Sequence, residues 1–146
     1  MPSRIVLPDV NLLVYAHNEI MPQHAAARAW WTALITEQQT IAIPWVVALG
    51  FLRLVTHPSV FRDPLPVLQA LERMEGWFGL ANVETLEPGA NHLRIMKRLV
   101  AATGATASLV TDAHLAALAI EYGCELHSND LDFARFPGVD WRNPLQ

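Results

Sequence analysis

The chain has 146 residues, of which 52% are hydrophobic and 16% are charged, and its formal net charge is −4. This composition excludes a disordered chain and predicts a single compact domain over residues 1–146. The longest uncharged apolar stretch, residues 41–52, is too short to span a bilayer and contains Pro44, and the amino terminus lacks the layout of a signal peptide. We therefore expect a cytoplasmic protein with no membrane partner.

The charge balance and the cysteine content narrow the class of ligand. The one cysteine, Cys124, cannot form an intramolecular disulfide, and no Cys or His at ligand spacing gives it a zinc pattern. A negative chain can bind nucleic acid only through a local basic patch or a bound metal, because Lys and Arg normally make the phosphate contacts. Candidates for that patch are Arg53, Arg94, Lys97, Arg98, Arg135 and Arg142, although each can equally be part of a solvated helix face.

Short β-branched or aliphatic runs alternate with segments of helical periodicity. In chain order we predict a strand at residues 4–8, helices at 11–18 and 24–36, a strand at 40–43, helices at 44–55 and 65–78, a strand at 83–86, helices at 91–102 and 111–122, a strand at 124–127, a helical turn at 132–135 and an edge strand at 139–141. Strands separated by helical crossovers predict an α/β fold, a three-layer α/β/α sandwich around a mainly parallel sheet.

The last two long helices have the more detailed patterns. In residues 91–102 the spacing places Leu93, Met96, Leu99 and Val100 inward. In residues 111–122 the apolar side chains fall at positions i, i+3, i+4 and i+7, namely Leu115, Leu118, Ala119 and Tyr122, before Gly123 stops the helix. The sequence lacks the G-x-G-x-x-G and P-loop patterns, so the common nucleotide-binding members of this fold class are poorly supported.

Four aspartates lie where a parallel sheet would leave its active-site edge: Asp9 after the first strand, Asp112 at the start of an apolar helix, and Asp130 and Asp132 after the fourth strand. Carboxylates that share a pocket repel one another unless a cation favours their ionised forms, and hard oxygen ligands suit Mg²⁺ or Mn²⁺. The sequence therefore predicts a divalent metal site and phosphate chemistry.

Each acid also has a purely structural interpretation. Asp112 could cap the helix that it precedes, and Asp130 and Asp132 could be ordinary turn and cap residues. Asp9 is harder to explain in this way, because an unpaired carboxylate among apolar neighbours is costly. Asn11 could cap the helix after it or orient a metal-bound water.

Three segments resemble those of PIN-domain ribonucleases, specifically the VapC toxins of type II toxin–antitoxin systems. They are D-V-N-L-L-V-Y-A from Asp9, D-A-H-L-A-A-L-A from Asp112 and S-N-D-L-D-F-A-R-F-P-G from Ser128, in the family's order and approximate spacing. The segment W-V-V-A-L-G-F-L-R-L-V-T-H-P from Trp45 is similar to the family's middle helix, but Gly50 stands about where that helix would carry a glutamate. The resemblance covers essentially the whole chain.

The resemblance implies a metal-dependent ribonuclease with Asp9, Asp112, Asp130 and Asp132 as catalytic residues. Asp9 and Asp112 would be the direct metal ligands, Asp130 would place a second metal or the water, and Asp132 would be a weaker member. The expected cofactor is Mg²⁺, with Mn²⁺ as a substitute. The expected partners are an RNA substrate, a VapB-type antitoxin whose tail occupies the active-site groove, and a second copy in a homodimer.

Two other functions remain open on the sequence. A PIN-like module that binds RNA or a protein without cutting would explain the missing glutamate and the acidic net charge. A phosphatase of the haloacid-dehalogenase type also has an Asp after its first strand. That chemistry uses a D-x-D pair, and here Asn11 occupies the place of the second acid.

Overall fold

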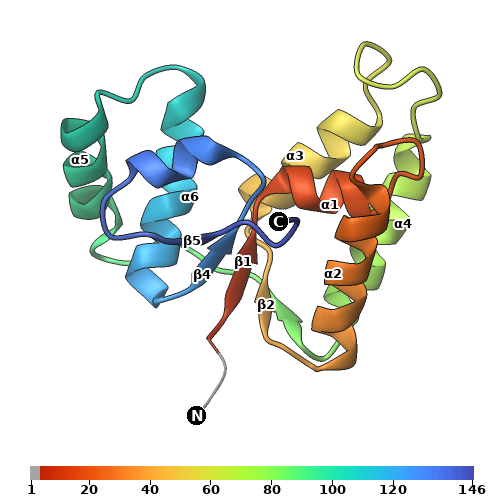
Figure 1. The fold of residues 1–146 in the computed structure, drawn as a ribbon, viewed down its shortest axis with the longest axis horizontal. Helices are drawn as coiled ribbons and strands as arrows, with labels where there is room; N and C mark the ends of the chain where they lie inside the picture. Colours follow the sequence, from red (N-terminus) through yellow and green to blue (C-terminus); the bar gives the residue numbers. More distant parts are fainter. Residues whose placement is uncertain (1–3) are drawn as a thin grey trace.

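The computed structural model describes residues 4–146, which form one parallel sheet with helices on both of its faces (Figure 1). The elements in chain order are β1 (Val6–Pro8), α1 (Val10–Ala16), α2 (His24–Thr36), β2 (Ile41–Ala42), α3 (Trp45–Val55), α4 (Val67–Phe78), β3 (Val83–Glu84), α5 (His92–Thr103), α6 (Ser108–Tyr122), β4 (Glu125–His127), the 3₁₀ helix η1 (Leu131–Arg135) and β5 (Asp140–Arg142).

The five strands are ordered β3-β2-β1-β4-β5 and all pair in parallel. Strand β1 lies in the middle and is buried along its whole length, which explains its uninterrupted apolar sequence. Leu7 of β1 lies opposite Leu126 of β4, and Val6 lies opposite Ile41 of β2. The chain adds strands on one side of β1 first and then crosses to the other side, so the strand order reverses between β1 and β4.

This reversal also explains how the helices are distributed. Parallel crossovers are almost always right-handed, so a change in the direction of strand addition moves the connecting helices to the opposite face. Helices α1 to α4 accordingly lie on one side of the sheet, and α5 and α6 lie on the other (Figure 1). The result is the three-layer α/β/α sandwich that the sequence predicts.

Most of the predicted elements are present, with ends that differ by a few residues. The helix predicted at residues 24–36 has those ends, and the helix predicted from Pro44 runs from Trp45 to Val55 with Pro44 before it. The first four strands are shorter than predicted, because regular pairing in the sheet covers only two or three residues in each, whereas β5 has the predicted length and is shifted by one residue. Cys124, predicted as the first residue of a strand, is buried and lies just before β4.

Two details of the helix predictions are wrong, the start of α6 and the inward position of Leu93. Helix α6 begins at Ser108, three residues before the predicted start at Thr111. In α5, Leu93 is 74% exposed, because the face that packs on α6 carries His92 and Leu99 instead. Tyr122, at the end of α6, is 42% exposed, and its hydroxyl donates to the Glu87 carbonyl.

None of the helices between residues 4 and 146 combines the length and the apolar character that crossing a membrane requires.

Candidate metal centre

The carboxyl ends of the two central strands deliver the first acids to one edge of the sheet. Asp9 follows β1 directly, and its backbone N–H donates to the His127 carbonyl at the end of β4 (2.8 Å). Ser128 follows β4, and Asp130 lies at the start of η1. This edge is where the strand order reverses, the position at which open α/β sheets bind their ligands.

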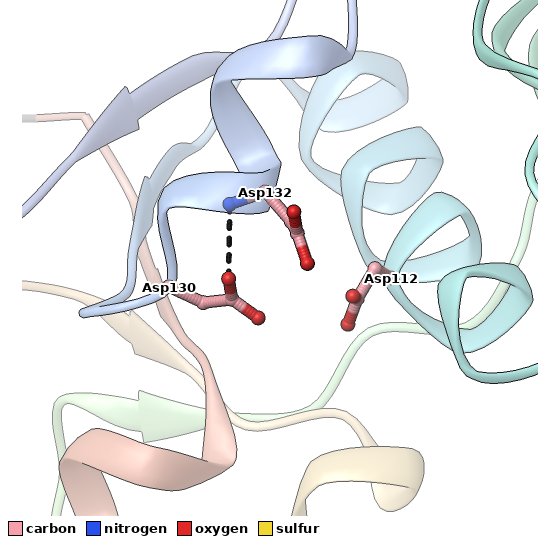
Figure 2. A group of neighbouring side chains, drawn as sticks. All are labelled: Asp112, Asp130 and Asp132. Atoms are coloured by element: carbon pink, nitrogen blue, oxygen red, sulfur yellow. Dashed lines mark hydrogen bonds between the residues drawn. The ribbon is translucent and has the colours of Figure 1, made fainter.

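Three carboxylates from the second half of the chain form a close group. Asp112, Asp130 and Asp132 can each present one oxygen such that the three oxygens lie within 4.8 Å of one another. Figure 2 shows the three side chains pointing toward one another, Asp112 from α6 and the other two from the start of η1. Carboxylate oxygens of this kind are the donors that hard divalent cations prefer, so this donor set fits such an ion.

The backbone around the group explains how these side chains are held. Asp130 accepts the Asp132 backbone N–H at 2.9 Å through one oxygen, which caps η1 (Figure 2). The predicted capping role of Asp130 is therefore confirmed. The capping interpretation of Asp112 is wrong, because α6 begins about one turn earlier at Ser108 and Asp112 lies within the helix. Asp112 therefore has helical backbone both before and after it, which fixes its position.

Asp9 lies behind this group in a more buried position, with 9% of its surface exposed. One oxygen accepts the Val10 backbone N–H at 2.7 Å and caps α1, and the other accepts the Ser128 hydroxyl at 2.7 Å. The fully buried Ser128 hydroxyl also accepts the Asp130 backbone N–H at 3.0 Å. Ser128 thus links Asp9, after β1, to Asp130, at the start of η1.

Asn11 completes the polar contacts around Ser128. Its side-chain N–H donates to the Ser128 hydroxyl at 3.4 Å, while its side-chain oxygen is buried with no hydrogen-bond partner in the described part of the chain. Asn11 does not cap α1, because Asp9 occupies the cap position. A buried acceptor without a donor is costly. The Asn11 oxygen is therefore available to accept a bond from a water beside Ser128.

Burial and the neighbouring charges raise the pKa values of Asp112 and Asp9. The pKa of Asp112 rises from 3.8 to about 6, first because of its burial and then because of the charges on Asp9, Asp130 and Asp132. The pKa of Asp9 is also raised, mainly by burial and in part by Asp130, although its bonds to Ser128 and Val10 oppose the rise. A nearby cation would reverse this cost by favouring the ionised forms.

A cavity of about 470 Å³ opens beside Asp9 and Asp112. One wall comes from α3, through Val46, Val47, Leu49, Gly50 and Arg53, and the other from α6, through Thr111 and Leu115. Gly50, at the predicted place of the missing glutamate, therefore does face this space. Arg53 supplies the positive charge among the lining residues.

The predicted site residues thus separate into two layers. Asp112, Asp130 and Asp132 form the close oxygen group, whereas Asp9 is joined to them through Ser128 and through charge. Sequence reasoning gave Ser128 no role, because a serine in a turn has many common uses.

Of the five tryptophans, Trp30, Trp31 and Trp77 are buried in the core, whereas Trp45 is half exposed and stacks on Phe78. Trp141 donates its indole N–H to the Ser128 carbonyl at 3.0 Å and steadies this loop.

Comparison with known proteins agrees with this geometry. The model of a family described as PIN domain matches residues 6–139. Ribonuclease VapC33 of Mycobacterium tuberculosis is 39% identical over 142 residues, which cover 97% of this chain and 99% of that protein. Ribonuclease VapC37 of the same species is 35% identical over 136 residues, which cover 93% and 94%.

Solved structures share the fold at lower identity. VapBC2 from Rickettsia felis, bound to a DNA fragment from its promoter, matches with a TM-score of 0.68 and 21% identity over 95% of this chain and 98% of that chain. VapC20 of Mycobacterium tuberculosis, described as a sarcin–ricin loop cleaving toxin, matches with a TM-score of 0.67 and 17% identity over 94% and 98%. The family match and the full-length relatives together show that this chain belongs to the PIN-domain family, among the VapC ribonucleases.

Proposed function

We propose that this chain is the toxin of a VapBC-type toxin–antitoxin pair and that it hydrolyses RNA phosphodiester bonds with Mg²⁺, for which Mn²⁺ can substitute. The observation that carries the proposal is the group of three carboxylates, Asp112, Asp130 and Asp132, with Asp9 directly behind it at the edge of the sheet. Relatives at 35–39% identity that carry the name ribonuclease support the same reaction class.

In this proposal Asp112, Asp130 and Asp132 hold the metal through their oxygens, and Asp9 is a further ligand or orients a bound water. When bound, a divalent cation would polarise the phosphoryl oxygen and lower the pKa of a water, which supplies the nucleophile. No covalent protein nucleophile is needed. Ser128 keeps the Asp9 carboxylate directed by donating to it, and the free Asn11 oxygen is available to orient the attacking water.

Arg53 has a proposed role in binding the substrate. It lies in the last turn of α3 and lines the same cavity as Asp9 and Asp112. A guanidinium can bind two phosphate oxygens at once, which a lysine ammonium cannot do in the same fixed geometry. We assign Arg53 to a contact with a phosphate next to the scissile one.

The proposed partners are an RNA, a VapB-type antitoxin and a second copy of the chain. Two solved structures that share this fold, from Rickettsia felis and Salmonella typhimurium, are of VapBC, which supports an antitoxin partner. An exposed apolar stretch on α3, with Trp45 50% and Leu49 55% exposed, runs to the mouth of the cavity and could receive an antitoxin segment. RNA substrates place the proposed action in the cytoplasm.

The test is cleavage of end-labelled small RNA by the purified protein, with Mg²⁺, with Mn²⁺ and with a chelator. Asp9→Asn removes the buried carboxylate, and Asp63→Asn, an exposed acid outside the site, is the matched control. We expect discrete cleavage that requires both metal and Asp9, whereas Asp63→Asn keeps the wild-type rate. Thermal melting of both variants checks that each remains folded.

Other outcomes would contradict the proposal in different ways. RNA that is bound but not cut, with binding unaffected by chelation, would indicate the binding-only PIN module and would make Gly50 its signature. Hydrolysis of a small phosphomonoester without action on RNA would indicate the phosphatase. Wild-type cleavage by Asp9→Asn would remove Asp9 from the site.

A further inference from the structure

The positive charge of this acidic protein is unevenly distributed along the sequence. The chain has ten Lys and Arg residues and fourteen Asp and Glu residues, yet no acid occurs in residues 88–111. The Lys and Arg residues of this stretch are Arg94, Lys97 and Arg98, and all three lie in α5. A locally positive segment is what a protein of net charge −4 needs to approach a polyanion.

Helix α5 presents these three cations on its outer surface. Residues at positions i, i+3 and i+4 share a helix face, and all three side chains are exposed, while His92 and Leu99 are buried on the side that packs on α6. None of the three makes an ion pair with an acid within residues 4–146, whereas Arg4 and Arg142 are both paired with Asp140. The charge on α5 is therefore available to an external partner.

A fourth cation continues this surface toward the metal centre. Arg135, at the end of η1, donates to the carbonyl of Thr103 at the end of α5 (3.4 Å), and its guanidinium lies 4.0 Å from an oxygen of Asp132. The Arg98 guanidinium extends to the loop after η1. A residue with a Cβ at position 138, where the chain has Gly138, would place that Cβ 4.0 Å from this guanidinium. Arg135 thus connects the α5 surface to the acidic group.

These four residues form a track that leads away from the metal centre along α5. At 1.5 Å per residue, the helix from Arg94 to Thr103 is roughly 14 Å long, which corresponds to about four nucleotides at a rise of ~3.4 Å. A hollow of about 420 Å³ lies at its far end, lined by Arg94, Arg98, Asn91, Ile95 and Ile120. Figure 1 shows α5 on the outer side of α6, where an RNA strand could reach it.

We infer that Arg94, Lys97, Arg98 and Arg135 bind the phosphate backbone of the RNA substrate a few nucleotides away from the scissile bond. This inference rests on the proposed ribonuclease function and adds how an acidic protein holds its substrate. Helix α5 carries no acid, so this part of the track complements a polyanion, and the occupant is RNA rather than a protein.

The test measures RNA binding apart from cleavage. In the Asp9→Asn background with chelator, fluorescence anisotropy gives the Kd for a 5′-labelled RNA of about 30 nucleotides at several salt concentrations. The track variant is Arg94→Gln/Lys97→Gln/Arg98→Gln. The control variant, Arg28→Gln/Arg62→Gln/Arg73→Gln, also loses three exposed cations, two of them in helices on the other side of the sheet.

We expect the track variant to bind about tenfold or more weakly, and its plot of log Kd against log salt to flatten by about 2, since each phosphate contact contributes ~0.7 for a single strand. The control variant should bind as the parent does. Equal weakening in both variants would overturn the inference, because net charge alone would then explain it. So would unchanged RNA binding by the track variant together with lost binding of an acidic antitoxin.

The proposed function can fail separately. If the wild-type protein cuts no RNA but the track variant still binds it selectively more weakly, the track stands and only the cleavage proposal fails. If the wild-type protein cuts RNA and the track variant binds and cuts it as the control does, the inference alone fails.

Discussion

Replacing Asp112 by asparagine should abolish RNA cleavage and at the same time make the metal-free protein more stable. Asparagine keeps the shape of the side chain but removes its charge. In the folded protein, burial first and then repulsion by Asp9, Asp130 and Asp132 raise the pKa of Asp112 from 3.8 to about 6. In the unfolded chain these costs are absent, so the ionised carboxylate favours unfolding.

The size of the effect follows from the pKa. A displacement from 3.8 to about 6 corresponds to about 3 kcal/mol for a fully ionised carboxylate. Because Asp112 is partly exposed and solvent screens its interactions, we expect the free energy of unfolding of Asp112→Asn to exceed that of wild type by about 1–2 kcal/mol at pH 7.5.

Urea denaturation at several pH values, in the presence of a chelator, measures this difference. Well below pH 3.8 the carboxyl is protonated in both states, so wild type and variant should unfold alike. The difference should grow as pH rises from 3.8 to about 6 and stay constant above it. Added Mg²⁺ should stabilise wild type and leave Asp112→Asn almost unchanged, because binding to the folded state alone raises stability.

A variant that is less stable than wild type at pH 7.5 would refute this reasoning, because it would show that Asp112 makes a structural contact worth more than the repulsion. A stability gain that persists unchanged at pH 4 would refute it as well, since the gain would then not come from charge.

Two further predictions concern the buried polar groups. His17 donates from Nδ1 to the Leu13 carbonyl (2.9 Å) and accepts the Trp77 indole N–H at Nε2 (3.0 Å), and burial lowers its pKa from 6.5 to about 4. Its neutral form stabilises the fold fully above pH 6.5, and this contribution is lost as pH falls toward 4. Between pH 7 and pH 4.5 the free energy of unfolding of wild type should therefore fall by about 2–3 kcal/mol more than that of His17→Gln. Urea denaturation at the two pH values measures this difference. Ser128→Ala should lower the free energy of unfolding by about 1–3 kcal/mol and slow RNA cleavage, because the buried Asp9 oxygen loses its donor. Replacing the exposed Ser108 by alanine should do neither. Equal cleavage rates in the two serine variants would show that Ser128 has no role in the site.

The fold was predictable because short apolar strands alternate with helices whose apolar residues follow the helical period. The start of α6 was not, and the reason lies in its cap. Ala107 precedes this helix in a positive-φ conformation (φ 52°) and offers no side-chain hydrogen bond, so the usual Ser, Thr or Asp signal is missing at the true start. Thr111-Asp112 gives that signal one turn later and misplaces the boundary.

The gathering of the four acids at one edge of the sheet was predictable, but their arrangement there was not. The order of strands and acids was enough to expect Asp9, Asp112, Asp130 and Asp132 at one edge of the sheet. That Asp9 turns both of its oxygens toward Val10 and Ser128, while the others face one another, depends on loop geometry after β4. No local pattern in the sequence encodes that geometry. Which of the four bind the metal therefore stays a prediction.

Because the strand order reverses between β1 and β4, the two halves of the chain contribute different parts of the site. The close oxygen group comes entirely from α6 and the segment after β4, whereas the α3 wall of the cavity, with Leu49, Gly50 and Arg53, comes from the first half. The half-exposed surface of α3 takes part neither in strand pairing nor in the group of three carboxylates. The residues that shape the α3 wall of the cavity can therefore change independently of the acids that form the oxygen group.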